Sequence, residues 1–190
     1  MNSSERVLIV SSTPKGTQFF AETLRAASVF EVTTVDAVSQ GRLFLRENTW
    51  DIVIINSPVG EDSGVKLAKE AAKIAQVILV VKNDSFGDVA TKCDSDGILT
   101  ISKPVNVPVF DSAVRLARTA QQRVRRVQEE NAQLVKKIED MRVIDRAKLL
   151  LVSSMKMSEN EAHRYIEKHA MDMRSTRRAV ADGILRTYEN

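Results

Sequence analysis

The polar residues best able to do chemistry in the N-terminal half follow short apolar runs. Ser11 and Ser12 come after the first run, Asn56 ends the third, and Lys103 comes after the fifth, whereas the fourth run ends in the apolar Val81. An asparagine amide is not a nucleophile that forms an acyl phosphate, and neutral hydroxyls are weak ligands for a hard dication, which prefers carboxylates. We therefore expect a site that neither binds a metal ion nor accepts a phosphoryl group.

Basic residues of the C-terminal part are a second group of candidates. Arg146 and Lys148 belong to one predicted helix, and Arg174, Ser175, Arg177 and Arg178 gather at the start of another. An arginine side chain forks onto phosphate or stacks on a base, and a helix N-terminus offers amide groups to phosphate oxygens. These six residues are the predicted contacts to a nucleic acid, and a solvated basic surface is the alternative.

Charge is distributed unevenly along the chain. Residues 1–114 hold 11 Lys and Arg against 14 Asp and Glu, a net charge of −3, whereas residues 115–190 hold 17 against 11, a net charge of +6. A basic C-terminal part behind an acidic N-terminal part suggests an effector that binds a polyanion.

Catalytic and metal-ligating constellations are not recognisable in the sequence. It contains no Ser-His-Asp set, cysteine–histidine pair or glycine-rich phosphate loop, and His163 and His169 miss the i, i+4 spacing of a helical zinc site. Cys93 is the only cysteine, which excludes an intrachain disulfide and fits a reducing cytoplasm. No apolar run approaches the ~20 residues of a membrane helix, and the first residues lack the pattern of a secretion signal. We expect a cytoplasmic protein that is not an enzyme and uses no metal or cofactor.

Apolar runs alternate with helical patterns over the first 105 residues. The predicted strands are Arg6–Ser11, Phe30–Val35, Asp51–Asn56, Val77–Val81 and Gly97–Ser102, and the predicted helices are Thr17–Ala27, Ala37–Glu47, Gly64–Ile74 and Phe86–Lys92. Runs as uniformly apolar as residues 77–81 fit strands that helices cover on both faces. The pattern predicts a doubly wound, flavodoxin-like parallel sheet of five strands, with a crevice beyond the carboxyl ends of the strands.

From about Val107 the pattern becomes continuously helical, with apolar residues at alternating intervals of three and four. The seam contains Ala113, Ala117, Ala120, Val124, Val127, Leu134, Ile138 and Met141, with Asn131 at the remaining a-type position. A single buried Asn at such a position costs stability but favours a parallel, in-register dimer. We predict a coiled-coil homodimer whose contacts are Val124, Val127, Asn131, Leu134, Ile138 and Met141. A helix packed on its own domain is the alternative.

The chain from Val143 onward is predicted to break into three short helices around a thin core. The apolar faces are Ile144, Ala147, Leu151 and Met155 in the first, Ala162, Ile166, Ala170 and Met173 in the second, and Val180, Ile184 and Tyr188 in the third. Ser158 and Glu161 have the spacing of a capping box, and Ser175 or Thr176 can cap the third helix. Arg177 falls on the apolar face of that helix, so it either extends its head to solvent or marks a shift of the face.

Residues 5–115, roughly, resemble the receiver domain of bacterial response regulators. Lys103-Pro104 and the strand ending at Asn56 carry the resemblance. In that family a strand-end aspartate accepts a phosphoryl group beside two magnesium-binding acids. Here those positions are Asn56, Ser11 and Ser12, while the family's hydroxyl and aromatic switch positions are Val81 and Thr100. The resemblance therefore implies a degenerate receiver without metal, acyl phosphate or a phosphate-gated switch. Lys103 is expected to bond Asn56 or backbone carbonyls instead.

The C-terminal part is similar to the ANTAR domain, the RNA-binding module of bacterial antitermination regulators. The matching residues are Val143–Lys148, Leu151, Ser158–Ala162, Ala170-Met171 and Val180-Ala181. This resemblance implies that the protein binds a pair of stem-loops in nascent messenger RNA and so prevents a terminator hairpin from forming.

The predicted organisation is α/β followed by all-α. A receiver-like domain covers residues 1–110, a coiled-coil dimerisation helix covers 111–141, and an ANTAR domain covers 142–190. The predicted function is phosphorylation-independent antitermination by a dimer on a two-hairpin leader RNA. A regulatory protein partner is the favoured input, ahead of a small ligand in the crevice or abundance alone. The alternatives are a DNA-binding regulator, an adaptor without nucleic acid, and a receiver phosphorylated on a displaced acid.

Overall fold

The computed structural model describes residues 4–26 and 30–188, which form two compact units that divide within one long helix. The first unit extends to Arg125 and the second begins at Arg126. The predicted domain limits at residues 110 and 141 coincide with neither a helix end nor this division. They remain a prediction.

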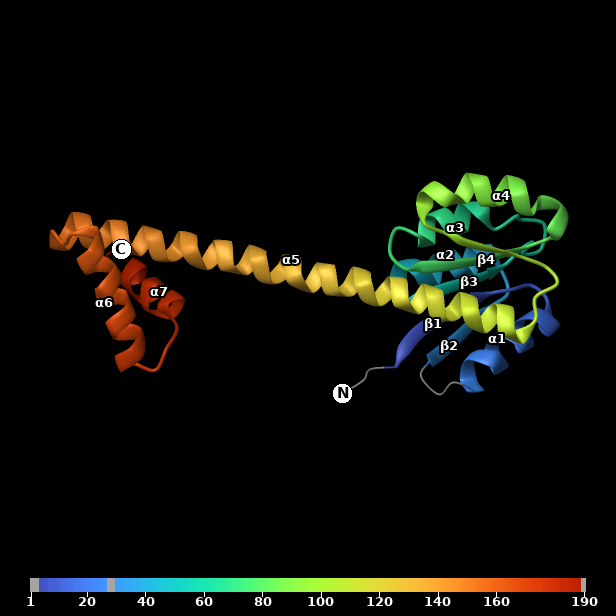
Figure 1. Cartoon of the computed structure of the whole chain (residues 1–190), viewed down its shortest axis with the longest axis horizontal. Coiled ribbons are helices and arrows are strands. Elements are labelled where there is room, and N and C mark those ends of the chain that lie inside the picture. Colours follow the sequence, from blue (N-terminus) through green and yellow to red (C-terminus); the bar gives the residue numbers. More distant parts are fainter. Residues whose placement is uncertain (1–3, 27–29, 189–190) are drawn as a thin grey trace. The chain divides into compact units, whose positions relative to one another are not determined.

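The N-terminal unit contains the predicted five-stranded parallel sheet (Figure 1). Its strands are β1 Glu5–Val10, β2 Phe30–Val35, β3 Ile52–Asn56, β4 Gln76–Val81 and β5 Leu99–Ser102. Their order in the sheet is β2-β1-β3-β4-β5, so the flavodoxin-like prediction is confirmed. Each strand lies within two residues of its predicted bounds, and the carboxyl ends of β1 and β3 are neighbours because these strands pair.

Helices cover both faces of the sheet, as the uniformly apolar strands require. They are α1 Pro14–Ala26, α2 Val38–Glu47, α3 Val65–Ala71, α4 Phe86–Cys93 and α5 Val107–Met155. Alternate strand residues face opposite layers: Leu8 and Val10 pack with α2, α3 and α4, whereas Val7 and Ile9 pack with α1 and the first turns of α5. The predicted end of the first helix, Ala27, lies outside the described residues.

The first turns of α5 belong to the core of the N-terminal unit. Phe110, Ala113, Val114 and Ala117 are all at most 5% exposed. The prediction that Ala113 and Ala117 start an intermolecular seam is therefore wrong, because these alanines let the helix approach its own sheet closely.

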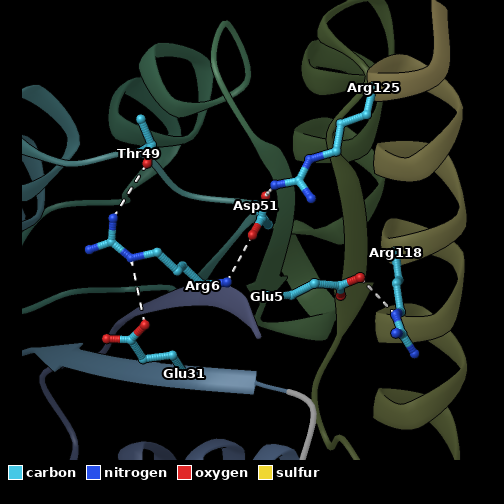
Figure 2. Close-up of polar contacts among 7 residues, drawn as sticks. All are labelled: Glu5, Arg6, Glu31, Thr49, Asp51, Arg118 and Arg125. Carbon is cyan, nitrogen blue, oxygen red and sulfur yellow. Dashed lines mark hydrogen bonds and ion pairs between the residues drawn. The ribbon is translucent and has the colours of Figure 1, made fainter. Parts of the chain in front are cut away.

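Ion pairs fasten the same helix to the amino-terminal edge of the sheet (Figure 2). Arg118 donates to Glu5 at 2.9 Å, and Arg125 donates to the buried carboxylate of Asp51. Asp51 also accepts the backbone N–H of Arg6 at 2.8 Å. Asp51 thus joins β1, the start of β3 and α5 through one carboxylate.

The C-terminal unit consists of the end of α5, α6 Glu159–Asp172 and α7 Arg177–Tyr188. Its small core is Ala147, Leu151, Ala162, Ile166, Ala181 and Ile184. The predicted break at Val143 is absent, because α5 continues through Met155 and itself supplies the first of the three helices. This continuity follows from a stretch without Pro or Gly between Pro108 and Gly183.

Local signals at the helix ends have mixed outcomes. The capping box is confirmed: Ser158 Oγ accepts from the Glu161 N–H at 3.3 Å, and Glu161 Oε2 accepts from the Ser158 N–H at 2.8 Å. Thr176 caps α7 by accepting from the Ala179 N–H at 3.1 Å. Met173 is 68% exposed rather than buried, because α6 ends at Asp172 and the chain turns there.

Replacing Asp51 with Ala should lower the free energy of unfolding of the N-terminal unit by about 2–3 kcal/mol, because the Arg6 N–H and the Arg125 guanidinium both lose their acceptor. Trp50, the only tryptophan, is buried in this unit, so its fluorescence during urea unfolding reports the change. Arg126→Ala is the control, since the pair that Arg126 makes with Glu130 on its own helix is exposed, and it should change stability by less than about 0.5 kcal/mol. Equal effects of the two substitutions would contradict a role for Asp51 in fastening α5.

Candidate functional site

At the carboxyl ends of β1 and β3, neutral side chains are joined by hydrogen bonds. Asn56 is 4% exposed, and its Nδ2 donates to Ser11 Oγ at 2.9 Å and to Thr13 Oγ1 at 3.1 Å. Its Oδ1 is buried and has no hydrogen-bond partner among the described residues. The amide thus occupies the position where the receiver resemblance expects a phosphate-accepting carboxylate, and it is held by hydroxyls instead of a metal.

Gly16, in the first turn of α1, closes the site from one side. A Cβ atom at this position would lie 2.3 Å from Asn56 Nδ2 and 2.6 Å from Thr13 Oγ1. Any larger residue would therefore displace the amide or its hydroxyl partner. The glycine is needed here for close approach.

Lys103 and Ser12 are bonded to backbone groups around the same edge. Lys103 Nζ donates to the Ser57 carbonyl at 2.7 Å, which is the second of the two partners expected for it. Burial lowers the pKa of Lys103, and the nearby positive charge of Lys82 adds to the effect. Ser12 Oγ accepts from the Gly60 N–H at 2.9 Å, and Val81 is 1% exposed in the core.

Acidic residues do not gather at this edge in a form that could hold a cation. In the described parts of the chain, no group of three or more His, Cys, Asp or Glu side chains has a metal-binding arrangement. Asp62 Oδ1 accepts from the Gly64 N–H at 2.7 Å, and Asp51 lies at the opposite end of β3 in the pair with Arg125. Both acids therefore already serve the fold.

Lys148 and Arg178, both predicted nucleic-acid contacts, pair with carboxylates of the C-terminal unit. Lys148 Nζ pairs with Asp145 at 2.7 Å, and its side chain is only 17% exposed. Arg178 donates to Asp182 at 3.0 Å and to Asp140 at 2.8 Å, and these two carboxylates raise the pKa of the guanidinium. Arg178 thus ties the start of α7 to α5.

Three other predicted contacts lie together where α6 ends and α7 begins. Arg174, Ser175 and Arg177 are exposed there, and Arg177 pairs with Glu167 of α6 at 3.1 Å. Ala181 and Ile184, four and seven residues later on the same side of α7, are buried, whereas the Arg177 side chain is 56% exposed, so it extends its head from the apolar face to solvent. Arg146 is exposed on α5.

The predicted dimer contacts form an apolar stripe on α5 without cover in the described chain. Val124, Val127, Leu134, Ile138 and Met141 are 42–63% exposed, and Asn131 is exposed with them. Helices hide such a stripe against another element or another molecule. Its role as a dimer interface remains a prediction.

Sequence reasoning missed Thr13 and Gly16 at the strand ends, and Glu167 and Met171 beside the arginines. The position of Thr13 and Gly16 directly after Ser11 and Ser12 was a usable signal, because the loop after a strand shares its edge. Glu167 and Met171 follow from helical spacing only once the bounds of α6 are known.

Comparisons with known proteins agree with these two units. Residues 132–185 match the model of the ANTAR domain family. Transcriptional regulatory protein PdtaR of Mycobacterium tuberculosis is 27% identical over 139 residues, which cover 72% of this chain and 68% of that protein.

Solved structures resemble the N-terminal unit. The CheY-like receiver domain protein from Methanospirillum hungatei has a TM-score of 0.57 at 18% identity, covering 64% of this chain and 98% of that one. The response regulator receiver domain protein from Clostridium thermocellum has a TM-score of 0.56 at 22% identity, with coverages of 63% and 98%. At these identities the likeness establishes the receiver fold. No helix in the described residues has both the length and the apolar character for crossing a bilayer.

Gly16→Ala should lower the free energy of unfolding by about 1–2 kcal/mol, because the added methyl group collides with the Asn56 amide. Helix propensity alone predicts the opposite, since Ala is favoured over Gly in a helix by roughly 0.5–1 kcal/mol. In an Asn56→Ala background the cost of Gly16→Ala should fall by at least half. Urea unfolding of the four proteins of this cycle, followed by Trp50 fluorescence, measures the coupling. Additive effects would show that Gly16 and Asn56 do not constrain each other.

Proposed function

Because this chain is a response regulator of the ANTAR type, with a receiver-fold domain in front of an ANTAR domain, we propose that it controls transcription by binding folded leader RNA. The observation that carries the proposal is the exposed arginine cluster at the α6–α7 connection, which lies inside the segment that matches the ANTAR family. Arginine suits such a site because it anchors phosphates and stacks on the unpaired bases of loops. Binding of two stem-loops would keep a terminator hairpin from forming.

Control of this activity does not use phosphorylation at the strand ends. Asn56 offers an amide held by Ser11 and Thr13, and the edge has no carboxylate set for magnesium among the described residues. Lys103, which has no phosphoryl group to bind, donates to a backbone carbonyl. A protein partner that covers the dimer stripe or the receiver unit is the favoured input, and the chain works in the cytoplasm without a cofactor.

The active form is a homodimer through the apolar stripe of α5. Five apolar side chains at heptad spacing and one Asn fit a parallel pair of helices. Pairing places two ANTAR domains on one molecule, so the second hairpin of a transcript binds at a high effective concentration after the first.

The full-length protein should shift a tandem-hairpin leader RNA in a gel and leave duplex DNA of the same sequence unbound at equal concentration. Arg174→Ala should weaken RNA binding by about tenfold, since loss of one charge-assisted contact costs roughly 1–2 kcal/mol. Tighter binding to the duplex would identify a DNA-binding regulator. Binding to neither polymer, with a protein partner still captured, would identify an adaptor.

Leu134→Lys should make the protein monomeric at micromolar concentration, because it buries a charge at the centre of the stripe. It should also weaken binding to the tandem hairpin far more than binding to a single hairpin, since only the tandem RNA uses both domains. Gln133→Lys adds the same charge one residue away, off the stripe, and should change neither. Sedimentation velocity and RNA titration read the two effects. A dimeric Leu134→Lys variant would exclude this interface.

A further inference from the structure

A hollow of about 690 Å³ opens between the end of α6 and the start of α7. The lining residues used below are Glu167, Ala170, Met171, Arg174 and Arg177. Its size is in the range of pockets that hold small molecules. It is also bordered by the exposed arginines of the proposed RNA surface.

The lining includes an apolar side chain that no core requires. Met171 is 75% exposed, although the adjacent Ala170 is buried and contributes to the packing of α6. A thioether is polarizable and makes favourable contacts with aromatic rings. An exposed methionine inside a cationic hollow therefore fits a ligand that has both an aromatic face and negative charge.

The polar residues of the hollow carry both signs of charge. Glu167 Oε1 lies 3.1 Å from Arg177 Nη1 and 3.3 Å from His163 Nε2, and its side chain is 44% exposed. A carboxylate accepts hydrogen bonds from the amino and imino edge of a base, whereas Arg174 and Arg177 suit phosphate oxygens. Nucleotides of a loop present such an edge because they are unpaired.

Arg174 is held in a conformation that favours glycine. The α6 helix ends in a Schellman motif, in which the Ser175 N–H donates to the Ala170 carbonyl at 2.9 Å and the Arg174 N–H donates to the Met171 carbonyl at 3.1 Å. This motif places Arg174 in the left-handed region, with φ 47°. An arginine at this position lowers the stability of the turn relative to glycine, which fits a side chain retained for binding.

We propose that this hollow receives one unpaired nucleobase of an RNA loop. The base lies on Met171 with its N–H edge toward Glu167, and Arg174 and Arg177 hold the flanking phosphates. This assignment rests on the proposed RNA-binding function and adds to it that the α6–α7 connection selects a base, rather than only attracting phosphates.

The test is a selection from a pool of tandem-hairpin RNAs with randomised loops, carried out with the full-length protein. The wild type should enrich one base at one loop position. Glu167→Gln and Met171→Ala should lose that preference while retaining binding within about tenfold, whereas Arg174→Ala should weaken all selected RNAs about equally. If both variants enrich the same base as the wild type, the hollow does not read a base. If the wild type enriches no hairpin RNA at all, the RNA-binding function itself fails, and the base site with it.

A matched pair of glycine substitutions separates strain from binding. Arg174→Gly and Lys156→Gly both replace a residue with positive φ, 47° and 57°. Both should raise the melting temperature by about 2 °C, because glycine adopts this conformation without strain. Only Arg174→Gly should weaken binding to an RNA selected by the wild type, by about tenfold. Unchanged affinity of Arg174→Gly would remove Arg174 from the site.

Discussion

Helix α5 carries apolar side chains along its 49 residues, and those of its first, middle and last parts have different surroundings. Its first turns pack Phe110 and Ala117 on the receiver sheet, and its last turns pack Ala147 and Leu151 with α6 and α7. The stripe between them has no cover in the described chain. Apolar surface of this extent is unfavourable in water, so the middle of α5 is the part of the molecule that association with a second chain would stabilise most.

The strand-end site shows how a receiver fold is kept once its charges are replaced. A receiver with carboxylates at this edge must balance like charges with a metal ion and a lysine. Here Asn56 Nδ2 donates to two hydroxyl groups in neutral hydrogen bonds, and Gly16 leaves room for the amide. Lys103 keeps its charge and is bonded to a carbonyl in a partly buried site. Because the acidic positions of a receiver are neutral here, this edge needs no ion or phosphoryl group to balance like negative charges.

The sheet could be predicted from the sequence because parallel strands that are buried on both faces leave uninterrupted apolar runs. The Ser158–Glu161 capping box could be predicted because its two residues are only three positions apart in the sequence. The heptad pattern was less informative. It identified the stripe of α5 but could not tell that the sheet covers Ala113 and Ala117, since the same spacing serves an intramolecular and an intermolecular partner. The predicted helix boundary at Val143 is wrong because no residue there interrupts α5.

The charged residues of the C-terminal unit were predicted by type but not by role. Lys148 has Asp145 three residues before it, and Arg178 has Asp182 four residues after it, so local partners were visible in the sequence. The contact between Arg178 and Asp140 was not, because it spans 38 residues and depends on how α7 packs on α5. Similarly, Met173 has the helical spacing of the apolar residues of α6, which predicts a core position, but the helix ends one residue earlier.

The pair between Arg178 and Asp140 connects the two proposed activities of the C-terminal unit. Asp140 directly precedes the stripe residue Met141 in sequence but projects from another side of α5, where it meets Arg178, the second residue of α7. Asp140 and the stripe belong to one continuous helix. A change in how α5 pairs in the proposed dimer would therefore change the position of Asp140 directly, with no flexible linker between them. In the proposed dimer, a partner that rotates or separates the two α5 helices would therefore act on the start of α7 through this ion pair. In this way dimerisation would control the geometry of the arginines at the α6–α7 connection, in addition to placing two sets of them on one molecule.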